Sequence, residues 1–361
     1  MNRPQHGGNL AWAASIAGCP ASSIVDFSAS INPLGIPQSA LTAIAEGIEK
    51  LTTYPDPQYS QLRSVLAEHH GIYPDCILPG NGSAELLTWA CRELAQQKVT
   101  HLVTPAFGDY QRALNAFGAK IALHPLNLED RTKAFNLTFR AKAFPPYGHT
   151  QQGLLLNNPH NPTGKLWTKN EILPYLEKFN LVVIDEAFMD FLPPSQQQSL
   201  ISAITDFPNL VILRSLTKFY SLPGLRIGYA IAHPARLERW QQWRDPWSVN
   251  SLAAAATEAV LQDTEFQQRT WNWLPEARSQ LLEGLSEISG VHPLPGAANF
   301  LLVKTDISVT QLQTQLLQKY KILIRDCLSF PELGDLYFRI AVRLPEDNLK
   351  LINAINSVIS H

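Results

Sequence analysis

The feature that most constrains the fold of this chain is an alternation of short apolar runs with longer amphipathic stretches. The runs are rich in Val, Ile and Leu, and those expected as strands are residues 100–104, 120–124, 153–157, 181–185, 209–214 and 226–232. Helices are expected between them, such as 58–70, which Gly71 ends, and 168–178, which Thr168 and Glu171 open as a capping box. Strands that alternate with helices predict an α/β fold with a mainly parallel sheet.

The pattern changes after about residue 245. The elements expected there are helices at 251–261 and 266–288, short strands at 299–304, 322–325 and 337–342, and a last helix at 346–359. The opening residues carry turn formers without a regular period, and we expect them to pack on the C-terminal part or on a partner subunit. The chain is therefore expected to form a large α/β domain over 38–245 and a smaller α+β domain from 246–361 with the N-terminal segment 1–37.

Composition excludes several classes of protein. The chain has 361 residues, which fits two domains of roughly 100–200 residues each. Lys and Arg number 29 against 31 Asp and Glu, so no basic excess is available to bind a nucleic acid. No apolar run approaches the roughly 20 residues of a membrane span, and no apolar signal core opens the chain. The four cysteines form no CxxC pair, so we expect a cytoplasmic protein without a disulfide framework or a metal site.

A lysine that follows the expected strand 209–214 is the first candidate for chemistry. Residues 215–219 read Ser-Leu-Thr-Lys-Phe, and Arg226 follows closely. An amine such as that of Lys218, beside hydroxyls and an arginine, suits a Schiff base with an aldehyde cofactor whose phosphate needs donors. Ser215 and Thr217 can donate hydroxyl hydrogen bonds, and Arg226 can add a charged fork. A solvent-exposed loop lysine is the alternative interpretation.

Two turns at element boundaries are further candidates. Residues 80–87, Gly-Asn-Gly-Ser-Ala-Glu-Leu-Leu, open a helix with a glycine-rich turn whose backbone N–H groups can face a phosphate. The same composition begins many helices that bind nothing, and the chain has no GxGxxG or P-loop pattern. Residues 157–164, Asn-Asn-Pro-His-Asn-Pro-Thr-Gly, form a rigid turn at a strand's carboxyl end, where α/β sheets place ligands. Prolines suffice for the turn, whereas the asparagines can also donate to a phenolate oxygen; His160 is interpreted as a turn residue.

An acid ends the apolar run 181–185. Asp185 is either an N-cap of the turn that follows or a functional carboxylate, and the run alone does not decide between them. It lies 33 residues before Lys218, with one expected strand between the two. That arrangement lets its carboxylate hold a pyridine ring nitrogen in the protonated form.

In this order, the four motifs resemble those of the fold-type I pyridoxal-phosphate enzymes, in the branch of the histidinol-phosphate aminotransferases, and the resemblance covers nearly the whole chain. Within that branch, the chain is most similar to the family of L-threonine-O-3-phosphate decarboxylases of cobalamin biosynthesis. The segments that carry this similarity are 6–9 (HGGN), 26–35 (DFSASINPLG), 216–226 (LTKFYSLPGLR), 324–327 (IRDC) and 338–343 (FRIAVR). The resemblance implies the fold-type I transferase fold, pyridoxal 5'-phosphate as the cofactor, and a homodimer.

The resemblance also implies a role for each matching position. Lys218 would carry the cofactor and move protons, Asp185 would pair with the pyridinium nitrogen, and Asn161 would bind the 3-oxygen. Phe107 would stack on the ring, unless it is a core residue. The residues expected at the cofactor phosphate are Gly82, Ser83, Ala84, Ser215, Thr217, Arg226 and, from the other subunit, Tyr54. The residues expected at the substrate are Arg339, for the α-carboxylate, with Arg325, His6, Asn9, Asn32 and Arg343.

Some of these positions have a plainer interpretation. Arg325 and Arg343 can equally be solvated charges on strands, and His6 lies near a terminus, where disorder is common. Phe188 stands two residues after Glu186, where aminotransferases of the branch often carry a tyrosine aimed at the 3-oxygen. This departure removes one donor and counts against a plain histidinol-phosphate aminotransferase.

The implied reaction is decarboxylation of L-threonine O-3-phosphate to (R)-1-amino-2-propanol O-phosphate and CO₂. The bond at Cα that breaks is the one held perpendicular to the cofactor ring, and that orientation is not readable from sequence. A histidinol-phosphate or related class II aminotransferase is therefore the alternative. A cofactor-bound but catalytically silent regulator or binding module is a third hypothesis. Neither a nucleic acid nor a membrane is expected as a partner.

Overall fold

A seven-stranded sheet is the largest element of the fold. The computed structural model describes residues 3–128 and 151–360. The sheet has the order β2-β8-β7-β6-β5-β3-β4. Its strands are β2 (Ile77–Asn81), β3 (Val99–Thr104), β4 (Ile121–Pro125), β5 (Gln152–Asn157), β6 (Leu181–Asp185), β7 (Leu210–Ser215) and β8 (Ile227–Ala232). Four of the six neighbouring pairs are parallel, and β8 is antiparallel to both of its neighbours, which confirms the predicted α/β fold with a mainly parallel sheet.

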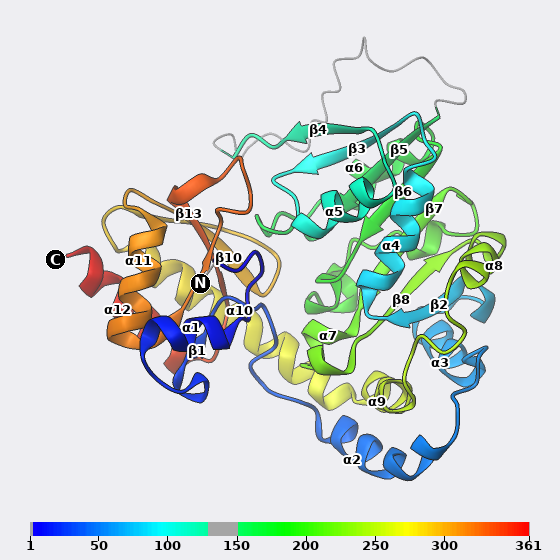
Figure 1. The fold of residues 1–361 in the computed structure, drawn as a ribbon, viewed down its shortest axis with the longest axis horizontal. Helices are drawn as coiled ribbons and strands as arrows, with labels where there is room; N and C mark the ends of the chain where they lie inside the picture. Colours follow the sequence, from blue (N-terminus) through cyan, green and yellow to red (C-terminus); the bar gives the residue numbers. More distant parts are fainter. Residues whose placement is uncertain (1–2, 129–150, 361) are drawn as a thin grey trace.

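Helices cover both faces of this sheet (Figure 1). Helices α4 (Ser83–Leu94), α5 (Gly108–Ala116) and α8 (Pro234–Trp243) pack on one face. Helices α3 (Ser60–His70), α6 (Lys169–Leu176) and α9 (Ser251–Gln262) pack on the other, with α2 (Gln38–Gly47) beside α9. Thr168 caps α6 in the predicted capping box, and Gly71 ends α3 in the left-handed conformation.

The side chains of β6 and β7 alternate between these two faces, as a strand's period of two requires. Val182 and Ile184 of β6 pack in the core under α3, α6 and α9, together with Ile212 of β7. Val183 and Leu213 pack in the core under α4, α5 and α8. The polar residues that end these two strands continue the same alternation.

The C-terminal part of the chain builds a second, antiparallel sheet. Its order is β12-β13-β10-β9, with β9 (Val291–Leu294), β10 (Phe300–Thr305), β12 (Arg325–Asp326) and β13 (Tyr337–Ala341). Its helices are α10 (Thr264–Ser286), α11 (Val309–Gln315) and α12 (Pro345–Ile359), and the long α10 reaches from this sheet towards the larger one (Figure 1). The division into domains 38–245 and 1–37 with 246–361 stays a prediction, and each of the two larger sheets lies on one side of the expected boundary.

The N-terminal segment has no regular period in its sequence, yet it contains a helix. Helix α1 (Leu10–Ala17) begins after Asn9, whose side chain accepts from the Trp12 N–H, and Gly18 ends it. Short and alanine-rich, this helix shows little amphipathic period, and it is stabilised by burying Trp12 against Leu317 and its neighbours. Strand β1 (Val25–Asp26) pairs in parallel with β11 (Ile322–Leu323), so the segment packs on the C-terminal part, as expected.

The prediction of one continuous strand over 322–325 is wrong. It is broken at Ile324, because β11 pairs with β1 whereas Arg325 in β12 pairs with Arg339 in β13. Strands β2 and β9 had no sequence prediction, since both are short and contain proline. These breaks depend on tertiary pairing, which no local pattern records.

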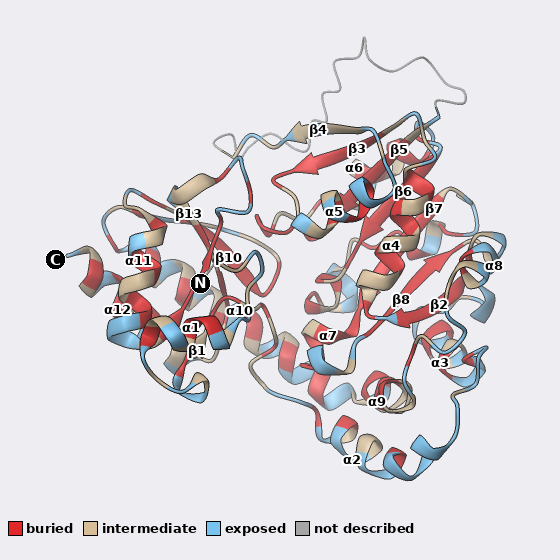
Figure 2. Ribbon diagram, viewed as in Figure 1, coloured by how far each residue is buried: buried red, intermediate tan, exposed pale blue. Residues whose placement is uncertain are grey.

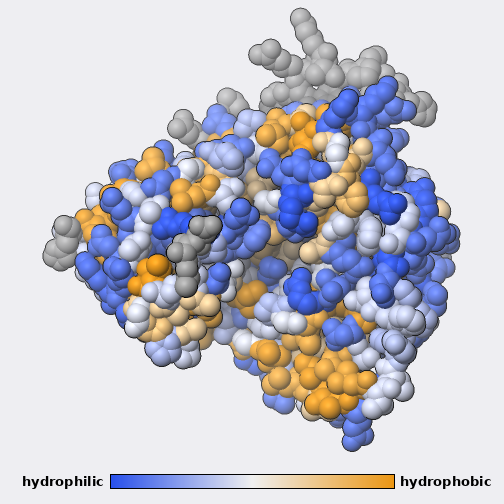
Figure 3. Space-filling view, viewed as in Figure 1, coloured by the Kyte–Doolittle hydropathy of each residue, from blue (hydrophilic) through white to orange (hydrophobic). Residues whose placement is uncertain are grey.

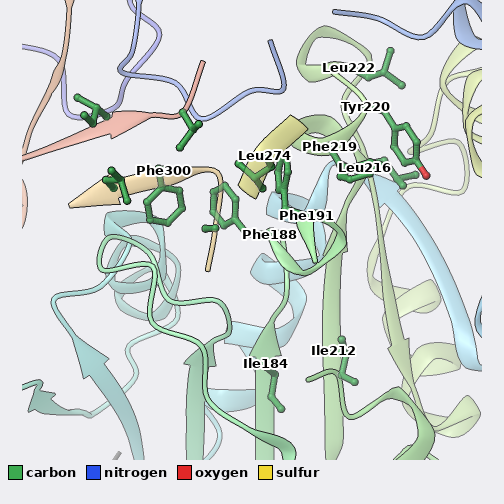
Figure 4. Packing of buried hydrophobic residues seen from close by; sticks show 14 of the residues in the cluster. Ile184, Phe188, Phe191, Ile212, Leu216, Phe219, Tyr220, Leu222, Leu274 and Phe300 are labelled. Atoms are coloured by element: carbon green, nitrogen blue, oxygen red, sulfur yellow. The ribbon is translucent and has the colours of Figure 1, made fainter. Parts of the chain in front are cut away.

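One apolar core joins the two parts of the molecule. Figure 2 shows that the central strands of the large sheet are buried, that the edge strand β4 is partly exposed, and that the outer faces of the surrounding helices are exposed. Figure 4 shows the region where the core passes from one sheet to the other, with Phe188 of the large part facing Phe300 of the small part. Their ring centres are 5.0 Å apart in an edge-to-face arrangement. Among the described residues, no helix is long and apolar enough to cross a membrane.

Candidate active site

Two adjoining cavities lie where β6 and β7 end and α4 begins. The first, of about 250 Å³, is called the Arg226 cavity after a residue that only it contacts. The second, of about 290 Å³, is called the Arg339 cavity for the same reason. The residues that line both are His6, Ser83, Phe107, Asp185 and Lys218. Carboxyl ends of parallel strands are the common place for ligands in open α/β sheets.

The Arg226 cavity is built on a turn that requires glycine. Gly82 has φ of +74° between β2 and α4, and a Cβ there would lie 2.6 Å from the Arg226 Nη2 atom. A Cβ on Gly228 would lie 2.5 Å from the Ser83 nitrogen. The first turn of α4 and the Arg226 guanidinium therefore approach each other closely, with the unpaired N–H groups of the helix beginning at Ser83 and Ala84. This is a cradle for an anion such as a phosphate.

Hydroxyl groups and the lysine complete this cavity. Strand β7 ends at Ser215 and leads into the short helix α7 (Leu216–Phe219). The Ser215 and Thr217 hydroxyl oxygens are 2.8 Å apart, and Lys218 Nζ donates to Thr217 Oγ1 over 3.2 Å. The turn is held from below by Asn32, whose backbone N–H donates to the Lys218 carbonyl.

The environment of Lys218 favours its neutral amine. Burial is the main cause that lowers the pKa of Lys218 to about 8, and the positive charges of Arg226 and Arg339 add to it. The Asp185 carboxylate opposes this shift by stabilising the protonated form. A lysine whose pKa lies near 8 has an appreciable fraction of nucleophilic amine at neutral pH.

Asp185 is a buried carboxylate held in a fixed orientation. Its Oδ2 accepts a 2.7 Å hydrogen bond from the Tyr110 hydroxyl, and its Oδ1 accepts from the Ala187 N–H. Burial raises the pKa of Asp185 above its ordinary value, although these hydrogen bonds and Lys218 act in the opposite direction. A carboxylate in such a site is stabilised by a cationic partner.

The asparagine turn connects this acid with the Arg339 cavity. Asn157 donates from Nδ2 to the Asp185 carbonyl, and its Oδ1 accepts from the Asn161 N–H. The Asn161 Oδ1 accepts a 2.6 Å hydrogen bond from Arg339 Nη1, so its Nδ2 is the end that can donate to a ligand. His160 is a turn residue, as predicted: it contacts Thr163, and burial lowers the pKa of its imidazole to about 3.

Two arginines face the Arg339 cavity. Arg339 is oriented by Asn161, by the Ser28 carbonyl and by the Phe300 ring, whose centre lies 5.1 Å from the guanidinium carbon. Its Nε is buried and has no hydrogen-bond partner among the described residues. Arg325 donates to the Gln5 carbonyl and to Ser329 Oγ. The cavity thus offers two cationic groups for an anionic molecule.

Phe107 and His6 close the site from the side of α5. Phe107 precedes α5 and lines both cavities, with its ring 5.6 Å from that of Tyr110. The His6 ring lies 5.7 Å from the Phe107 ring. The N-terminal segment therefore reaches the site, which its sequence pattern did not reveal.

Four predicted residues do not line either cavity. Asn9 caps α1, and Asn32 donates from Nδ2 to the Phe219 carbonyl and to Thr270. Arg343 is held by Asp347 and by the Asp26 carbonyl. Tyr54 is 79% exposed and packs against Trp247 on the outer surface. Asn9, Asn32 and Arg343 thus have structural partners here, and Tyr54 is available to a neighbouring molecule.

The sequence predictions did not include several residues that line the site. Tyr110, Ser28 and Ser329 contact Asp185, Arg339 and Arg325 respectively. Tyr110 follows Phe107 by three residues, a spacing that places both on one side of a helix start, and this was the available signal. No group of metal-ligating side chains is present in residues 3–128 and 151–360.

Residues 22–355 match the family described as Aminotransferase class I and II. The threonine-phosphate decarboxylase of Salmonella typhimurium is 37% identical over 360 residues, covering 98% of this chain and 96% of that protein. The adenosylcobalamin biosynthesis bifunctional protein CobDQ of Leptospira interrogans is 33% identical, covering 99% of this chain and 41% of that protein. The crystal structure of the histidinol-phosphate aminotransferase from Clostridium acetobutylicum is similar with a TM-score of 0.83 and 28% identity, covering 92% of this chain and 98% of that one.

Proposed function

Because this chain belongs to the class I and II aminotransferase family, we propose that it is a pyridoxal-phosphate-dependent lyase that decarboxylates L-threonine O-3-phosphate. The products are (R)-1-amino-2-propanol O-phosphate and CO₂. The similarity to a threonine-phosphate decarboxylase over nearly the whole of both chains supports this substrate. The similarity to a protein of adenosylcobalamin biosynthesis supports a place in that pathway.

The observation that carries the proposal is the convergence of four kinds of group on two adjoining cavities. A lysine amine and a buried carboxylate line both of them, an anion cradle lies in the Arg226 cavity, and two arginines lie in the Arg339 cavity. A substrate that carries both a carboxylate and a phosphate needs two cationic groups beyond those that hold the cofactor. Arg339 and Arg325 are the two on this side of Lys218.

The residues present fit pyridoxal phosphate. The cradle made by Gly82, the α4 N-terminus and Arg226 would hold its phosphate, together with Ser215 and Thr217. A cationic ring nitrogen would pair with the buried Asp185 carboxylate and stabilise its charge. Asn161 would donate to the 3-oxygen, and Phe107 would lie against the ring. When bound, this cofactor supplies an electron sink that stabilises negative charge at the substrate Cα.

The side chains divide the catalytic work. Asp185 would hold the ring nitrogen of the cofactor in its protonated form, and the cofactor would then act as the electron sink. Arg339 holds the substrate carboxylate, and its fixed contacts with Asn161, Ser28 and Phe300 orient the bond from Cα to the carboxyl carbon. When that bond breaks, its electron pair stays at Cα and CO₂ leaves. The protonated Lys218 Nζ would then donate a proton to Cα and become a neutral amine.

Recognition of the substrate phosphate is assigned to Arg325, with His6 beside it. Arg325 is buried and already oriented by Ser329 and the Gln5 carbonyl, so its guanidinium is held in place before substrate arrives. His6 lies on the same N-terminal segment as Gln5 and lines the same cavity. We propose this pair in preference to Asn9, Asn32 and Arg343, whose polar groups are used elsewhere.

We also propose that the protein acts as a cytoplasmic homodimer in which Tyr54 reaches the cofactor phosphate of the partner subunit. Exposed apolar side chains gather on η2 (Ile48–Thr52) and its surroundings: Leu41, Ile48, Leu51, Tyr54 and Trp247. Figure 3 shows an apolar patch over this region, near α2 and α9. A contiguous apolar surface of this kind is typical of a protein interface.

An aminotransferase acting on histidinol phosphate or a related amino donor is the second candidate. The similarity of this chain's fold to that of the Clostridium enzyme favours it. Phe188 counts against this second candidate, because its ring packs on Phe300 and offers no hydroxyl to the 3-oxygen.

The deciding experiment incubates the cofactor-loaded protein with L-threonine O-3-phosphate and no oxo acid. Sustained release of CO₂ over many turnovers, with formation of the phosphoamine, is expected. No CO₂ release, with histidinol phosphate instead converting the bound cofactor to its pyridoxamine form, would establish the aminotransferase. A protein that binds the cofactor but turns over neither substrate would be the silent homologue.

A further inference from the structure

A second pair of charged residues lies directly beside the catalytic ones in the chain. Glu186 follows Asp185 at the end of β6, and Arg214 precedes Ser215 at the end of β7. Arg214 Nε lies 3.0 Å from Glu186 Oε2, and each side chain is 1% exposed. The proposed mechanism makes no use of this buried ion pair.

The alternation of the two strands places this pair on the opposite face of the sheet from the cofactor site. Asp185 and Ser215 face the cavities, on the side of Val183 and Leu213. Glu186 and Arg214 therefore continue the side of Ile184 and Ile212. Each strand end thus carries one residue for the site and one residue for the ion pair.

The pair extends the ladder of β6 and β7 beyond its last paired residues. The paired register of the two strands ends at Asp185 opposite Leu213, and the Glu186 N–H donates to the Leu213 carbonyl over 2.8 Å. The ion pair then joins the next residues of the two strands through their side chains. The ion pair therefore links the two strands at the end of their backbone ladder, next to Asp185 and Ser215.

Further contacts tie the pair to the small part of the molecule. Arg214 Nη1 also contacts the Asp190 carboxylate, and the Asp190 carbonyl accepts a 2.8 Å hydrogen bond from Trp271 of α10. The two guanidinium contacts, with Glu186 and Asp190, leave Arg214 little freedom to rotate. Displacement of either strand end would break this set of contacts.

We infer that Glu186 and Arg214 are positioning residues that hold the ends of β6 and β7 in the geometry needed by Asp185 and Ser215. This inference rests on the proposed function, because it assigns the pair a role towards the cofactor site. A buried ion pair is a poor source of net stability compared with apolar residues of similar volume. Its rigid geometry is the property that an apolar replacement cannot supply.

The consequence can be followed at Lys218. The Asp185 carboxylate favours the protonated form of that lysine, so it opposes the lowering of the lysine's pKa by burial. If the end of β6 is released, Asp185 can move away from Lys218. The carboxylate then stabilises the protonated amine less, and the pKa of Lys218 falls further. The same release loosens Ser215 at the anion cradle and weakens cofactor binding.

The test compares the wild-type protein with the double variant Glu186→Leu, Arg214→Met, which replaces both charges with apolar groups, and with the single variant Glu186→Gln. The matched control is Glu93→Gln. Glu93 is a similarly buried carboxylate, 2.9 Å from Arg239, on α4 but outside both cavities. Thermal unfolding reports stability, and titration with pyridoxal phosphate reports the dissociation constant. Competitive labelling of the cofactor-free protein with acetic anhydride across pH reports the pKa of Lys218.

We expect the double variant to unfold below the wild-type temperature, because Asp190 loses its arginine partner. We also expect it to bind pyridoxal phosphate about tenfold more weakly and to have a lower Lys218 pKa. Glu186→Gln is expected to move both readouts in the same direction by a smaller factor. Glu93→Gln is expected to lower the unfolding temperature without moving either. The inference is overturned if either folded variant at position 186 keeps both wild-type values, or if Glu93→Gln moves them equally.

Failure of the proposed function gives a different result. A wild-type protein that does not bind pyridoxal phosphate contradicts the proposed function at once. The labelling measurement needs no cofactor, so the pKa of Lys218 in the variants still decides whether the pair positions Asp185.

Discussion

The charge of single buried residues governs how this site behaves with pH. Lys218 is partly buried, and its pKa in the folded protein is about 8, below the ordinary 10.5. The folded state therefore prefers the neutral amine, and below pH 8 the protonated amine opposes folding. This penalty disappears as the pH rises from 8 to 10.5, because the unfolded chain then loses its proton as well.

Replacing Lys218 with methionine should therefore stabilise the cofactor-free protein at pH 7. One pKa unit corresponds to about 1.4 kcal/mol, and since the side chain keeps some contact with water we expect a gain of about 2 kcal/mol. Urea unfolding at pH 7 and at pH 10.5 measures it. The gain should vanish at the higher pH, and the variant should form no visible absorbance band with pyridoxal phosphate. An equal gain at both pH values would contradict the assigned pKa.

The Tyr110 hydroxyl is expected to keep Asp185 ionised. It donates to Asp185 Oδ2 and lowers the pKa of that carboxyl against the effect of burial. In Tyr110→Phe the pKa of Asp185 rises, so the acidic limb of the rate profile moves to higher pH. Because a hydrogen bond to a charged group contributes about 1.5–3 kcal/mol, kcat should fall by at least roughly tenfold.

The control for this variant is Tyr59→Phe. The Tyr59 hydroxyl is also buried, and it bonds to the backbone of Val249 outside both cavities. It should lose stability and keep its pH profile. An unchanged acidic limb in Tyr110→Phe would show that the hydroxyl does not act on Asp185.

The sequence predicted those site residues that form a recognisable motif with their neighbours in the chain. Lys218 and Arg226 share one motif, and Asp185 ends an unmistakable apolar strand. Tyr110 escaped it because its partner lies 75 residues away and the contact exists only after folding. Asn32 is the opposite case. Its segment matches the family, yet its side-chain amide donates to the Phe219 carbonyl and not to a ligand site.

At the scale of elements, the turn from β2 to α4 is the most demanding piece of local structure. Gly82→Ala places a methyl group where the Arg226 guanidinium lies and puts a side chain at φ of +74°. We expect the dissociation constant for pyridoxal phosphate to rise at least about tenfold, because Arg226 must move out of the cradle. Titration of visible absorbance measures it.

Gly118→Ala separates this effect from backbone strain. Gly118 has φ of +69°, and a Cβ there would meet no atom within 4 Å. It should lose stability through strain and bind the cofactor with wild-type affinity. Equal weakening by both variants would mean that strain, rather than the displacement of Arg226, is responsible.

The pattern of short apolar runs identified the buried strands to within a residue, as β6 at Leu181–Asp185 shows. It failed for β2, whose five residues include Pro79 and Gly80. It also failed for β11 and β12, where a single apolar run serves two sheets. In these cases the strand is defined by its partner rather than by its own residues.

For the whole molecule, the apolar surface around η2 predicts the assembly. Leu51 is 53% exposed within this patch, three residues before Tyr54. A buried charge at a dimer interface is strongly unfavourable, so Leu51→Asp should convert a dimer into monomers at micromolar concentration. Sedimentation velocity measures the change.

The same variant should also lose affinity for pyridoxal phosphate, since a monomer receives no Tyr54 from a partner. Leu349→Asp is the matched control, because Leu349 is 49% exposed on α12, outside the patch. It should remain dimeric with unchanged affinity. Tyr54→Phe should weaken cofactor binding while leaving the dimer intact, because it removes the hydroxyl and keeps the apolar ring. If Leu51→Asp became monomeric yet bound the cofactor as tightly as the wild type, each subunit would hold a complete phosphate site of its own, and the assignment of Tyr54 to the neighbouring subunit would be wrong.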